Sequence, residues 1–510
     1  MPSDILLFPP FRLDVQNQEL WNGPQPVAIR PKTFAVLVYL ARHAQRLVTK
    51  EELLGNVWAN VSVGAELLRS YISELRLALG DDARSPRYLA TVSRRGYKFL
   101  PRVSIEGDAH DAPPSSRRSL TPITVGILHS LTGMTGESEM PVIDATLLAI
   151  EELNECGGID GHPVRAVVVD GRSNERVFAA SAERLIREQG IQTLFGCWTS
   201  ASRRAVRDVV EQNDRLLVYP MQFEGMEQSP NIVYTGAAPN QQILPAVRWA
   251  FGFLRHRRFF LVGYDSVFSW AVHALIRDEV AALGGEVVGD EYLTGDAVDS
   301  ERTVQRIQQA QPDLILNTVG GQPGLGYSRA LRAAGVTPQV VPTIYFSLGE
   351  IELLSLPRGQ NAGDYAAWNY FQSLERPENH SFISRFRARY GSHRVLADPM
   401  EAAYFGVKMW GQAVETAGSD EAPAVRRALR GQSFDAPQGH VRIDPENQYT
   451  WKTMRIGRIG ERAQFDVLWS SERPMRPEPF ASSRLPRTWS AFLDDLHRRW
   501  DGNWSGKVAV

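Results

Sequence analysis

The chain has 510 residues, of which 43% are apolar and 22% charged, and its formal net charge is −2. This length exceeds what one hydrophobic core serves and predicts roughly two to four domains, and the composition excludes a wholly disordered chain. Residues 1–104 carry 14 Lys and Arg against 9 Asp and Glu, whereas the remainder carries 42 against 49. We therefore expect a small basic domain with an anionic partner, joined to a larger acidic body.

The start of the chain gives no sign of export. MPSDILLFPPFRLD lacks the basic n-region, the long apolar core and the small-residue cleavage site of a secretory signal. No stretch approaches 18 uninterrupted apolar residues, so no membrane span is predicted. Cys156 and Cys197 are the only cysteines, which is typical of a reducing compartment and favours unpaired thiols. We expect a cytoplasmic protein with no membrane partner.

The first sixty residues show short alternating runs followed by helical patterns. The runs ILLFPPFRLDV and ELWNGPQPVAI predict a small antiparallel sheet with a turn at residues 22–24. PKTFAVLVYLARHA then repeats apolar residues at helical spacing, with Pro31 near its start. In the next predicted helix, TKEELLGNVWAN, Thr49 can cap the start while Glu52 returns the bond in a capping box.

A third helix is predicted over AELLRSYISELRLALG and ends at Gly80. Its apolar stripe is formed by Leu68, Tyr71, Ile72, Leu75 and Leu79. The segment PRYLATVSRRGYKFLP follows as a basic hairpin, whose tip can form at Arg95-Gly96. Sheet, helices and terminal hairpin together predict a small α+β winged helix-turn-helix domain over residues 1–104.

The segments SYISELRLALGDD and YLATVSRRGYKF resemble the effector domain of OmpR/PhoB-type regulators, over roughly residues 5–103. The resemblance implies that the third helix enters the major groove of double-stranded DNA and that the hairpin, the wing, touches the adjacent minor groove or backbone. The segment WANVSVGAE corresponds to a loop that contacts RNA polymerase in some members of that family. RNA polymerase is therefore a further candidate partner.

Seven residues are candidate DNA contacts. They are Arg69, Ser70, Ser73 and Arg76 on the third helix, and Arg94, Arg95 and Lys98 on the wing. The helix arginines can reach guanine edges or phosphates, and the serines are short enough to allow close approach. The wing cations would mainly neutralise phosphate, without reading sequence. A solvated surface charge is the alternative for each cation, and Tyr97 and Phe99 are expected in the core.

Beyond the wing, IEGDAHDAPPSSRRSLTP is rich in Pro, Ser and charge and predicts a flexible linker over residues 105–121. Strand and helix patterns then alternate, beginning with PITVGILHS, DATLLAIEELNE, VRAVVVDG and ERVFAASAERLIREQG. Repeated βαβ units predict parallel sheets covered on both faces, and the length suits two lobes better than one sheet. We expect residues 122–510 to form an α/β ligand-binding body, with the ligand outside the carboxyl ends of the strands.

Several segments of the body, among them QFEGMEQSPNIVYTGAAPNQQILPAV, DYAAWNYFQS and FDAPQGHVRIDPENQYTWKT, resemble the substrate-binding proteins of urea ABC transporters. They are also similar to the amide-sensing negative regulator of bacterial amidase operons. The resemblance covers about residues 122–507 and implies the type I periplasmic-binding-protein fold, in which two Rossmann-like lobes are hinged by crossover strands and close on a small ligand. It also implies urea or a short-chain amide as the ligand class.

A pocket for a planar, neutral amide needs donors for the carbonyl group, acceptors for the N–H groups and an aromatic wall. The segment GCWTS offers Trp198 as a wall and the hydroxyl groups of Thr199 and Ser200, at a strand end followed by a helix start. The resemblance to the amide sensor implies ligand contacts at Trp198, Ser200 and Tyr219.

Asp265, in GYDSVF, and Thr318, in NTVGG, stand at two further strand ends and complete the candidate ligand-binding set. Structural roles are the alternatives, with Asp265 capping the next helix, Thr318 holding a sheet end and Trp198 packing between lobes. Met221 stands where the amide sensor has a hydroxyl residue, and Tyr264 precedes Asp265 where the family has aspartate before tyrosine. These departures leave the identity of the ligand open.

The sequence contains no H-E-x-x-H, no clustered metal ligands and no G-x-S-x-G elbow, so we assign no catalytic residue, metal or cofactor. It predicts a cytoplasmic one-component transcription regulator, a homodimer in which lobe closure on a solute changes how paired heads bind DNA. One alternative is the solute-binding subunit of a urea or amide ABC transporter with an accessory DNA-binding head, which an export signal would mark. Another alternative is an amide-hydrolysing enzyme, which an assay for ammonia release would distinguish.

Overall fold

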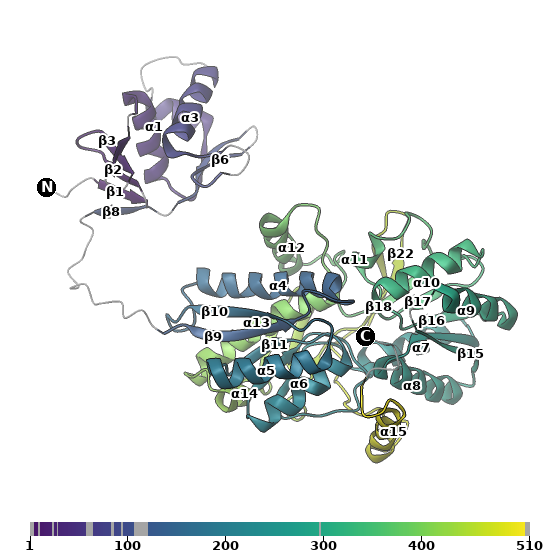
Figure 1. The fold of residues 1–510 in the computed structure, drawn as a ribbon. Coiled ribbons are helices and arrows are strands. Elements are labelled where there is room, and N and C mark those ends of the chain that lie inside the picture. Colours follow the sequence, from purple (N-terminus) through teal and green to yellow (C-terminus); the bar gives the residue numbers. More distant parts are fainter. Residues whose placement is uncertain are drawn as a thin grey trace. The chain divides into compact units, whose positions relative to one another are not determined.

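The computed structural model describes residues 5–8, 11–22, 25–27, 29–57, 65–82, 86–92, 95–101, 103–106, 121–294 and 297–504. The chain forms two compact units, Met1–Arg118 and Ser119–Val510 (Figure 1). Their described parts are called the head and the body below. The candidate polymerase loop at 58–64, Arg94 at the wing and most of the predicted linker, 107–120, lie outside the described residues.

The head combines an N-terminal antiparallel sheet, helices and a second small sheet that contains the wing. The sheets have the strand orders β4-β3-β2-β1-β8 and β5-β7-β6. Because Ser104–Glu106 pair with Ile5–Leu7 in the first sheet, the head extends two residues into the predicted linker. The elements are β1 (Ile5–Phe8), β2 (Phe11–Asp14), β3 (Glu19–Asn22), β4 (Gln25–Val27), α1 (Pro31–Arg42), β5 (Leu47–Thr49), α2 (Lys50–Val57), α3 (Ala65–Leu79), β6 (Leu89–Val92), β7 (Gly96–Phe99) and β8 (Ser104–Glu106).

Helix α3 buries most of the stripe that its sequence predicts. The buried residues are Leu68, Ile72, Leu75 and Leu79. Gly80 follows with a φ of +61°, and Tyr97 and Phe99 of the wing strand pack in the same core, as expected. At Gly96 a Cβ atom would lie 2.0 Å from Val48 O, so only glycine lets the wing strand approach β5 this closely.

The start of α2 is capped as predicted, but without the capping box. Thr49 Oγ1 accepts a hydrogen bond from Glu52 N at 3.1 Å. The Glu52 carboxylate binds the Arg46 guanidinium and the Tyr39 hydroxyl instead of returning to Thr49. The Arg46 guanidinium thus takes the place of the Thr49 backbone N–H as the partner of the Glu52 carboxylate.

The first lobe of the body is a parallel sheet of order β10-β9-β11-β12-β13 with helices on both faces (Figure 1). One face packs against α4 and α13 (Asp398–Ala417), and the other against α5 and α6. In β9, the side chains of Val125 and Ile127 pack on the first face and that of Leu128 packs on the second. The elements are β9 (Ile123–His129), α4 (Gly136–Glu155), β10 (Val164–Asp170), α5 (Glu175–Gln189), β11 (Thr193–Gly196), α6 (Ser200–Gln212), β12 (Leu216–Tyr219) and β13 (Ile232–Tyr234).

The second lobe has the strand order β15-β14-β16-β17-β18-β22-β23, parallel as far as β18 and antiparallel beyond it. In β14, Phe259 and Leu261 pack with α7 and α8, while Phe260 and Val262 pack with α9 and α10. The elements are α7 (Ile243–Gly252), β14 (Arg258–Tyr264), α8 (Val267–Leu283), β15 (Glu286–Leu293), α9 (Ala297–Ala310), β16 (Leu314–Asn317), α10 (Gly321–Ala333), β17 (Thr343–Tyr345), α11 (Glu350–Leu353), β18 (Tyr365–Trp368), β22 (Arg455–Ile459) and β23 (Phe465–Ser470).

The chain crosses between the lobes after β13, after β18 and before β22. Buried polar side chains tie these crossings together. Lys452 Nζ donates to Thr235 O at 3.0 Å, and Asn369 Nδ2 donates to Gln241 O and Thr453 O, each at 3.1 Å. The elements between the last two crossings are α12 (Pro377–Tyr390), α13 (Asp398–Ala417), α14 (Ala422–Leu429), β19 (Ser433–Ala436), β20 (Gly439–Ile443) and β21 (Thr450–Trp451). The predicted fold, an α/β body of two lobes that follows a small winged head along the chain, is confirmed.

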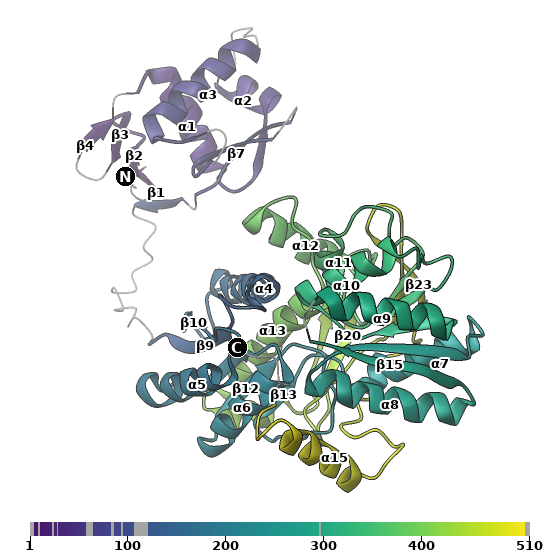
Figure 2. The same ribbon diagram turned by 45° about the vertical axis from the view of Figure 1, so that its right-hand side comes forward.

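The last described segment contacts both lobes, and residues 486–504 are called the strap below. Its helix α15 (Pro486–Arg499) lies beside α8 of the second lobe (Figure 2). Trp489 of α15 is fully buried and packs in one apolar cluster with Ala271 and Leu275 of α8. Beyond the helix, the Trp504 ring lies 4.4 Å from the guanidinium carbon of Arg204 on α6 of the first lobe. No helix within the described residues is both long and apolar enough to cross a membrane.

Candidate ligand-binding cleft and DNA-binding head

A cavity of about 1160 Å³ lies between the two lobes, at the carboxyl ends of their strands. The first lobe contributes Trp198, Thr199 and Ser200 to its wall, and the second contributes Asp265 and Thr318. The structure thus brings five of the six predicted ligand-binding residues to one cavity. Direct contact with a ligand stays a prediction for each of them.

An unusual backbone at the end of β11 presents the GCWTS segment to the cavity. Gly196 has a φ of +147°, and a Cβ atom there would lie 2.0 Å from Leu128 O. Cys197 follows with a φ of +65°, a left-handed conformation that costs a non-glycine residue about 1–3 kcal/mol. Thr199 then caps α6, because its Oγ1 accepts from Ser202 N at 3.0 Å. Strain of this kind is typical of a segment held for function.

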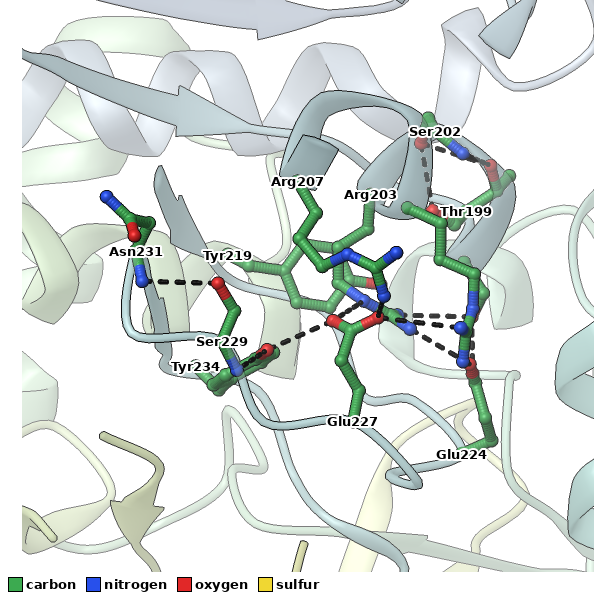
Figure 3. A network of polar contacts seen from close by, with 12 residues as sticks. Thr199, Ser202, Arg203, Arg207, Tyr219, Glu224, Glu227, Ser229, Asn231 and Tyr234 are labelled. Carbon is green, nitrogen blue, oxygen red and sulfur yellow. Dashed lines mark hydrogen bonds and ion pairs between the residues drawn. The ribbon is translucent and has the colours of Figure 1, made fainter. Parts of the chain in front are cut away.

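A buried cluster of charges fixes the cavity end of α6 (Figure 3). Arg203 is fully buried, and its Nη2 lies 2.9 Å from Glu224 Oε1 while its Nε lies 3.0 Å from Glu227 Oε1. Arg204 Nη2 adds a 3.0 Å contact to Glu224 Oε1, and Arg207 Nη1 lies 3.0 Å from Glu227 Oε2. The two glutamates stand on the loop after β12, so the cluster fastens that loop to α6.

The charge of both glutamates is preserved despite their burial. Burial alone would raise their pKa values, but the Arg203 and Arg204 guanidinium groups hold the pKa of Glu224 below its usual range. With Arg207 added, the same attraction lowers the pKa of Glu227 to about 2. Both side chains are therefore ionised at neutral pH and can only accept hydrogen bonds.

The cluster reaches the cavity through Ser200. Ser200 Oγ donates to Glu224 Oε2 and accepts from Arg203 Nη1 at 3.2 Å. Ser200 also lines the cavity. Its hydroxyl group is therefore oriented by a buried carboxylate and not by solvent.

Tyr219 is the one predicted ligand-binding residue that the described part of the cavity wall does not include. It is fully buried, and its hydroxyl donates to Trp198 O at 3.0 Å. Its ring also faces the Arg203 guanidinium, whose carbon lies 5.0 Å from the ring centre. The structure places Tyr219 behind the wall, where it supports Trp198.

Thr318 lines the second-lobe wall, but its hydroxyl group is well occupied. Its Oγ1 lies 3.3 Å from Val262 O, 2.9 Å from Ser269 Oγ and 3.2 Å from His273 Nε2, and His273 Nδ1 lies 2.6 Å from Asp290 Oδ1. The order hydroxyl, imidazole, carboxylate resembles a nucleophile triad. Val262 O can only accept, and His273 Nε2 also accepts when Nδ1 donates to Asp290, so the hydroxyl group is shared among protein partners and holds the strand end.

Asp265 does not cap the helix that follows it. Ser266 is the N-cap of α8, where its Oγ accepts from Ser269 N at 3.4 Å. Asp265 Oδ1 accepts from Trp270 Nε1 at 2.8 Å instead. The carboxylate therefore stands at the cavity with one oxygen bound to an indole.

The sequence interpretation missed Gln222, which lines the cavity from the loop after β12. Its Nε2 donates to Phe346 O at 3.3 Å, while its Oε1 is buried without a partner among the described residues. An unpaired buried acceptor costs about 1–3 kcal/mol. The only sequence signal was its position next to Met221, two residues after a strand.

The C-terminal residues of the cavity wall were missed as well. Asp501, Asn503 and Trp504 of the strap line the cavity, although they follow the first-lobe wall by about 300 residues. The sequence offered no signal for this, since the segment is short and has no strand-end position. Within the described residues, no group of three or more His, Cys, Asp or Glu side chains could hold a metal ion.

In the head, Ser73 and Arg95 are exposed and Lys98 is half-buried. Arg76 Nη2 donates to Leu89 O at 3.0 Å and to Thr91 Oγ1 at 2.8 Å, so this arginine braces α3 against the wing strand β6. The side chains of Arg69, Ser70 and Arg94 lie outside the described part of the chain. DNA contact by the seven candidates stays a prediction.

The head and the body each match a known family. Residues 123–486 match the periplasmic binding protein domain, and residues 24–99 match the family described as transcriptional regulatory protein, C terminal. The Leu/Ile/Val-binding protein homolog 6 of Brucella suis biovar 1 is 25% identical over 291 residues, which are 55% of this chain and 73% of that protein. A solute-binding protein of an ABC transporter from R. palustris, solved in complex with 4-hydroxybenzoate, has a TM-score of 0.64 at 20% identity and covers 69% of this chain and 98% of its own.

Two further relatives are similar over short regions. Limonene hydroxylase of Geobacillus stearothermophilus is 32% identical over 124 residues, 24% of this chain and 23% of that protein. The transcriptional activator CadC of Escherichia coli is 40% identical over 85 residues, 16% of each chain. The chain thus spans less than a quarter of either relative. Over residues 123–486 the chain belongs to the periplasmic binding protein domain family, and in front of this domain it carries an OmpR/PhoB-type transcriptional regulatory domain.

Proposed function

We propose that the protein is a ligand-responsive transcription regulator that binds double-stranded DNA through its head and a small neutral solute, urea or a short-chain amide, in its cleft. The observation that carries the proposal is the union in one chain of a regulatory domain and a solute-binding domain with a cavity at its strand ends. The protein acts in the compartment that holds the DNA and has no catalytic role.

The polar groups of the cavity support a ligand that both donates and accepts hydrogen bonds. Ser200 and Ala201 stand in the first turn of α6, where backbone N–H groups precede the first intrahelical bond and can donate to a carbonyl oxygen. The Ser200 hydroxyl donates to Glu224 and accepts from Arg203, so it retains one lone pair that can accept from an N–H group. Trp198 and Trp368 supply aromatic wall. A primary amide or urea satisfies both kinds of group at once.

The charges that line the cavity favour a neutral ligand over an anion. The lining carboxylates are Glu139, Glu175, Asp265, Glu352 and Asp501, and the lining arginines are Arg172 and Arg176. An anion such as the 4-hydroxybenzoate of the similar structure would meet this excess of negative charge. A neutral amide avoids that repulsion.

The response requires that the open and closed forms of the body differ in their effect on DNA binding. A ligand shifts an equilibrium only by its differential affinity for the two states, about 1.4 kcal/mol for each tenfold change. We propose a homodimer, because two heads on two half-sites bind more tightly and more selectively than one. RNA polymerase is a further proposed partner.

The test is DNA binding by the full-length protein with and without ligand. DNA fragments selected by the protein from a random pool would be titrated in the presence of urea, acetamide or no ligand, at one fixed salt concentration. We expect at least a tenfold change in affinity, or a change in the number of protomers bound, with one of the two ligands. Identical affinity and stoichiometry in all three conditions would contradict the proposal.

A further inference from the structure

We infer that the cleft takes an amide with an aromatic substituent, a ligand of the benzamide class, whose ring lies against an apolar part of the wall that includes Phe268 and Ile351. The inference rests on the proposed function, since it keeps the neutral amide group and assigns an occupant to the rest of the cavity. Urea and acetamide then represent only the head group of the ligand.

The cavity is much larger than urea or acetamide requires. Its volume is about 1160 Å³, whereas pockets of about 300–1,000 Å³ already hold drug-sized ligands. A molecule as small as urea takes the place of roughly two or three water molecules, at about 30 Å³ each. Such a ligand would leave most of the cavity to solvent, and a larger ligand would fill it.

This volume does not result from widely separated lobes, because side chains of the two lobes meet at the rim of the cavity. Gln322 Nε2, at the start of α10, donates to Glu137 Oε2, at the start of α4, at 3.1 Å. Tyr264 Oη of the second lobe lies 4.0 Å from Met134 Sδ of the first. The cavity is therefore the space that remains while the lobes are already in contact.

Three apolar side chains of the wall retain exposed surface. Met134 is 57% exposed, and Phe268, in the first turn of α8, and Ile351, in α11, are half-buried. All three line the cavity. Ile351 belongs to the same apolar cluster as Val142 of α4, which also lines the cavity, so the apolar surface extends across both lobes.

An aromatic ring suits this surface better than the methyl group of acetamide or a flexible chain. Removal of apolar surface from water favours binding in proportion to the area covered, and a ring covers more of it than a methyl group. A ring can also stack on, or place its edge against, the ring of Phe268. Because a ring is rigid, it loses less conformational freedom on binding than an alkyl chain of similar size.

The matched probes for the test are acetamide and benzamide, which share the primary amide group and differ only where a phenyl ring replaces a methyl group. Their affinities for the full-length protein would be measured by isothermal titration calorimetry. We expect benzamide to bind at least tenfold more tightly, because its ring buries several additional apolar carbon atoms. Equal affinities, or a preference for acetamide, would overturn the inference and leave the proposed function standing.

Phe268→Ala and Ile351→Ala test whether this part of the wall carries the preference. Each should lower benzamide affinity about threefold to tenfold and leave acetamide affinity unchanged. Phe253→Ala and Leu354→Ala are the matched controls, since these side chains are 71% and 61% exposed and are not among the described residues that line the cavity. Both controls remove a side chain of the same kind and should keep the wild-type preference.

The inference is overturned if both wall variants keep the wild-type preference for benzamide, or if the controls lower it as much as the wall variants do. Wild-type protein that binds none of urea, acetamide and benzamide would refute the proposed ligand class together with this inference. Binding of urea or acetamide without a gain from the ring would refute the inference alone.

Discussion

Arg203 shows how a single buried cation can organise a ligand-binding wall. It has no exposed surface, and it lies over the rings of Tyr219 and Phe223 with its carbon 5.0 and 4.4 Å from their centres. Its desolvation is offset only because Glu224 and Glu227 are present together. Removing one member of such a group leaves buried charge without compensation, which is more destabilising than the group as a whole is stabilising.

Arg203→Met should therefore destabilise the body by about 3–5 kcal/mol, because Glu224 and Glu227 would lose their central cation. Guanidinium chloride unfolding followed by circular dichroism would measure this, with urea avoided because it is a proposed ligand. Arg207→Met is the control: its side chain is 24% exposed, so its loss should cost clearly less. Equal losses for the two variants would contradict this account of the cluster.

Glu350 is a buried carboxylate without a cation among the described residues to hold its charge, in contrast to Glu224 and Glu227. Burial raises its pKa to about 8, against the hydrogen bond that its Oε1 accepts from Gln372 N at 2.7 Å. Between pH 4.5 and about 8 the folded protein thus keeps a proton on Glu350 that the unfolded chain releases. Folding takes up this proton, so the group makes the free energy of unfolding fall as pH rises through that window.

Glu350→Gln should abolish this dependence while keeping the oxygen that accepts from Gln372 N. The free energy of unfolding, measured in guanidinium chloride at pH 5.5, 6.5 and 7.5, should fall more steeply for the wild type than for the variant. The difference in slope should approach about 1.4 kcal/mol per pH unit. Parallel slopes would show that Glu350 is ionised in the folded protein.

Among the elements, α3 and the wing are joined by Arg76, which the sequence predicts as a DNA contact. Arg76 donates to Leu89 O and Thr91 Oγ1, so it fixes the angle between the helix and β6. Arg95 stands at the exposed end of the wing. On this basis Arg76 would support the DNA-binding surface and Arg95 would be free to meet a phosphate.

Arg95→Ala should weaken DNA binding similarly for all sequences, because a phosphate contact carries no base information. The slope of the logarithm of the association constant against the logarithm of salt concentration should become shallower by about one, as measured by fluorescence anisotropy. Arg87→Ala is the comparison, since Arg87 Nη2 is engaged with Gly80 O at 3.2 Å. An unchanged slope for Arg95→Ala would exclude the wing contact.

The elements were predictable from sequence to the extent that they depend on local pattern. The stripe of α3 and the βαβ alternation of the body follow from hydrophobic periodicity, and GCWTS was found because it follows a strand. Glu224 and Gln222 were not found, since their roles arise from contacts with Arg203 and with Phe346, 124 residues away. The sequence predicts Tyr219 at the cavity because this residue ends a strand. A position in the sequence cannot show whether other residues cover the side chain in the fold.

At the scale of the whole molecule, the division into Met1–Arg118 and Ser119–Val510 predicts separate unfolding. Differential scanning calorimetry of the full chain should show two transitions. Acetamide should raise only the transition of the body, and double-stranded DNA only that of the head, because each ligand stabilises the unit that binds it. At 100 times its dissociation constant, the ligand should add about 2.7 kcal/mol to the body. One shared transition would contradict independent units.

The strap gives the cleft a second closure besides its hinge. Because α15 is anchored on α8 while Trp504 stacks on Arg204, the lobes cannot separate fully until this contact breaks or the helix detaches. Release of a solute from the cleft would then require the Trp504 contact to break as well as the lobes to open, and would be slower than through lobe opening alone. A regulator with such a latch would respond to the average solute level over its residence time and would ignore brief fluctuations.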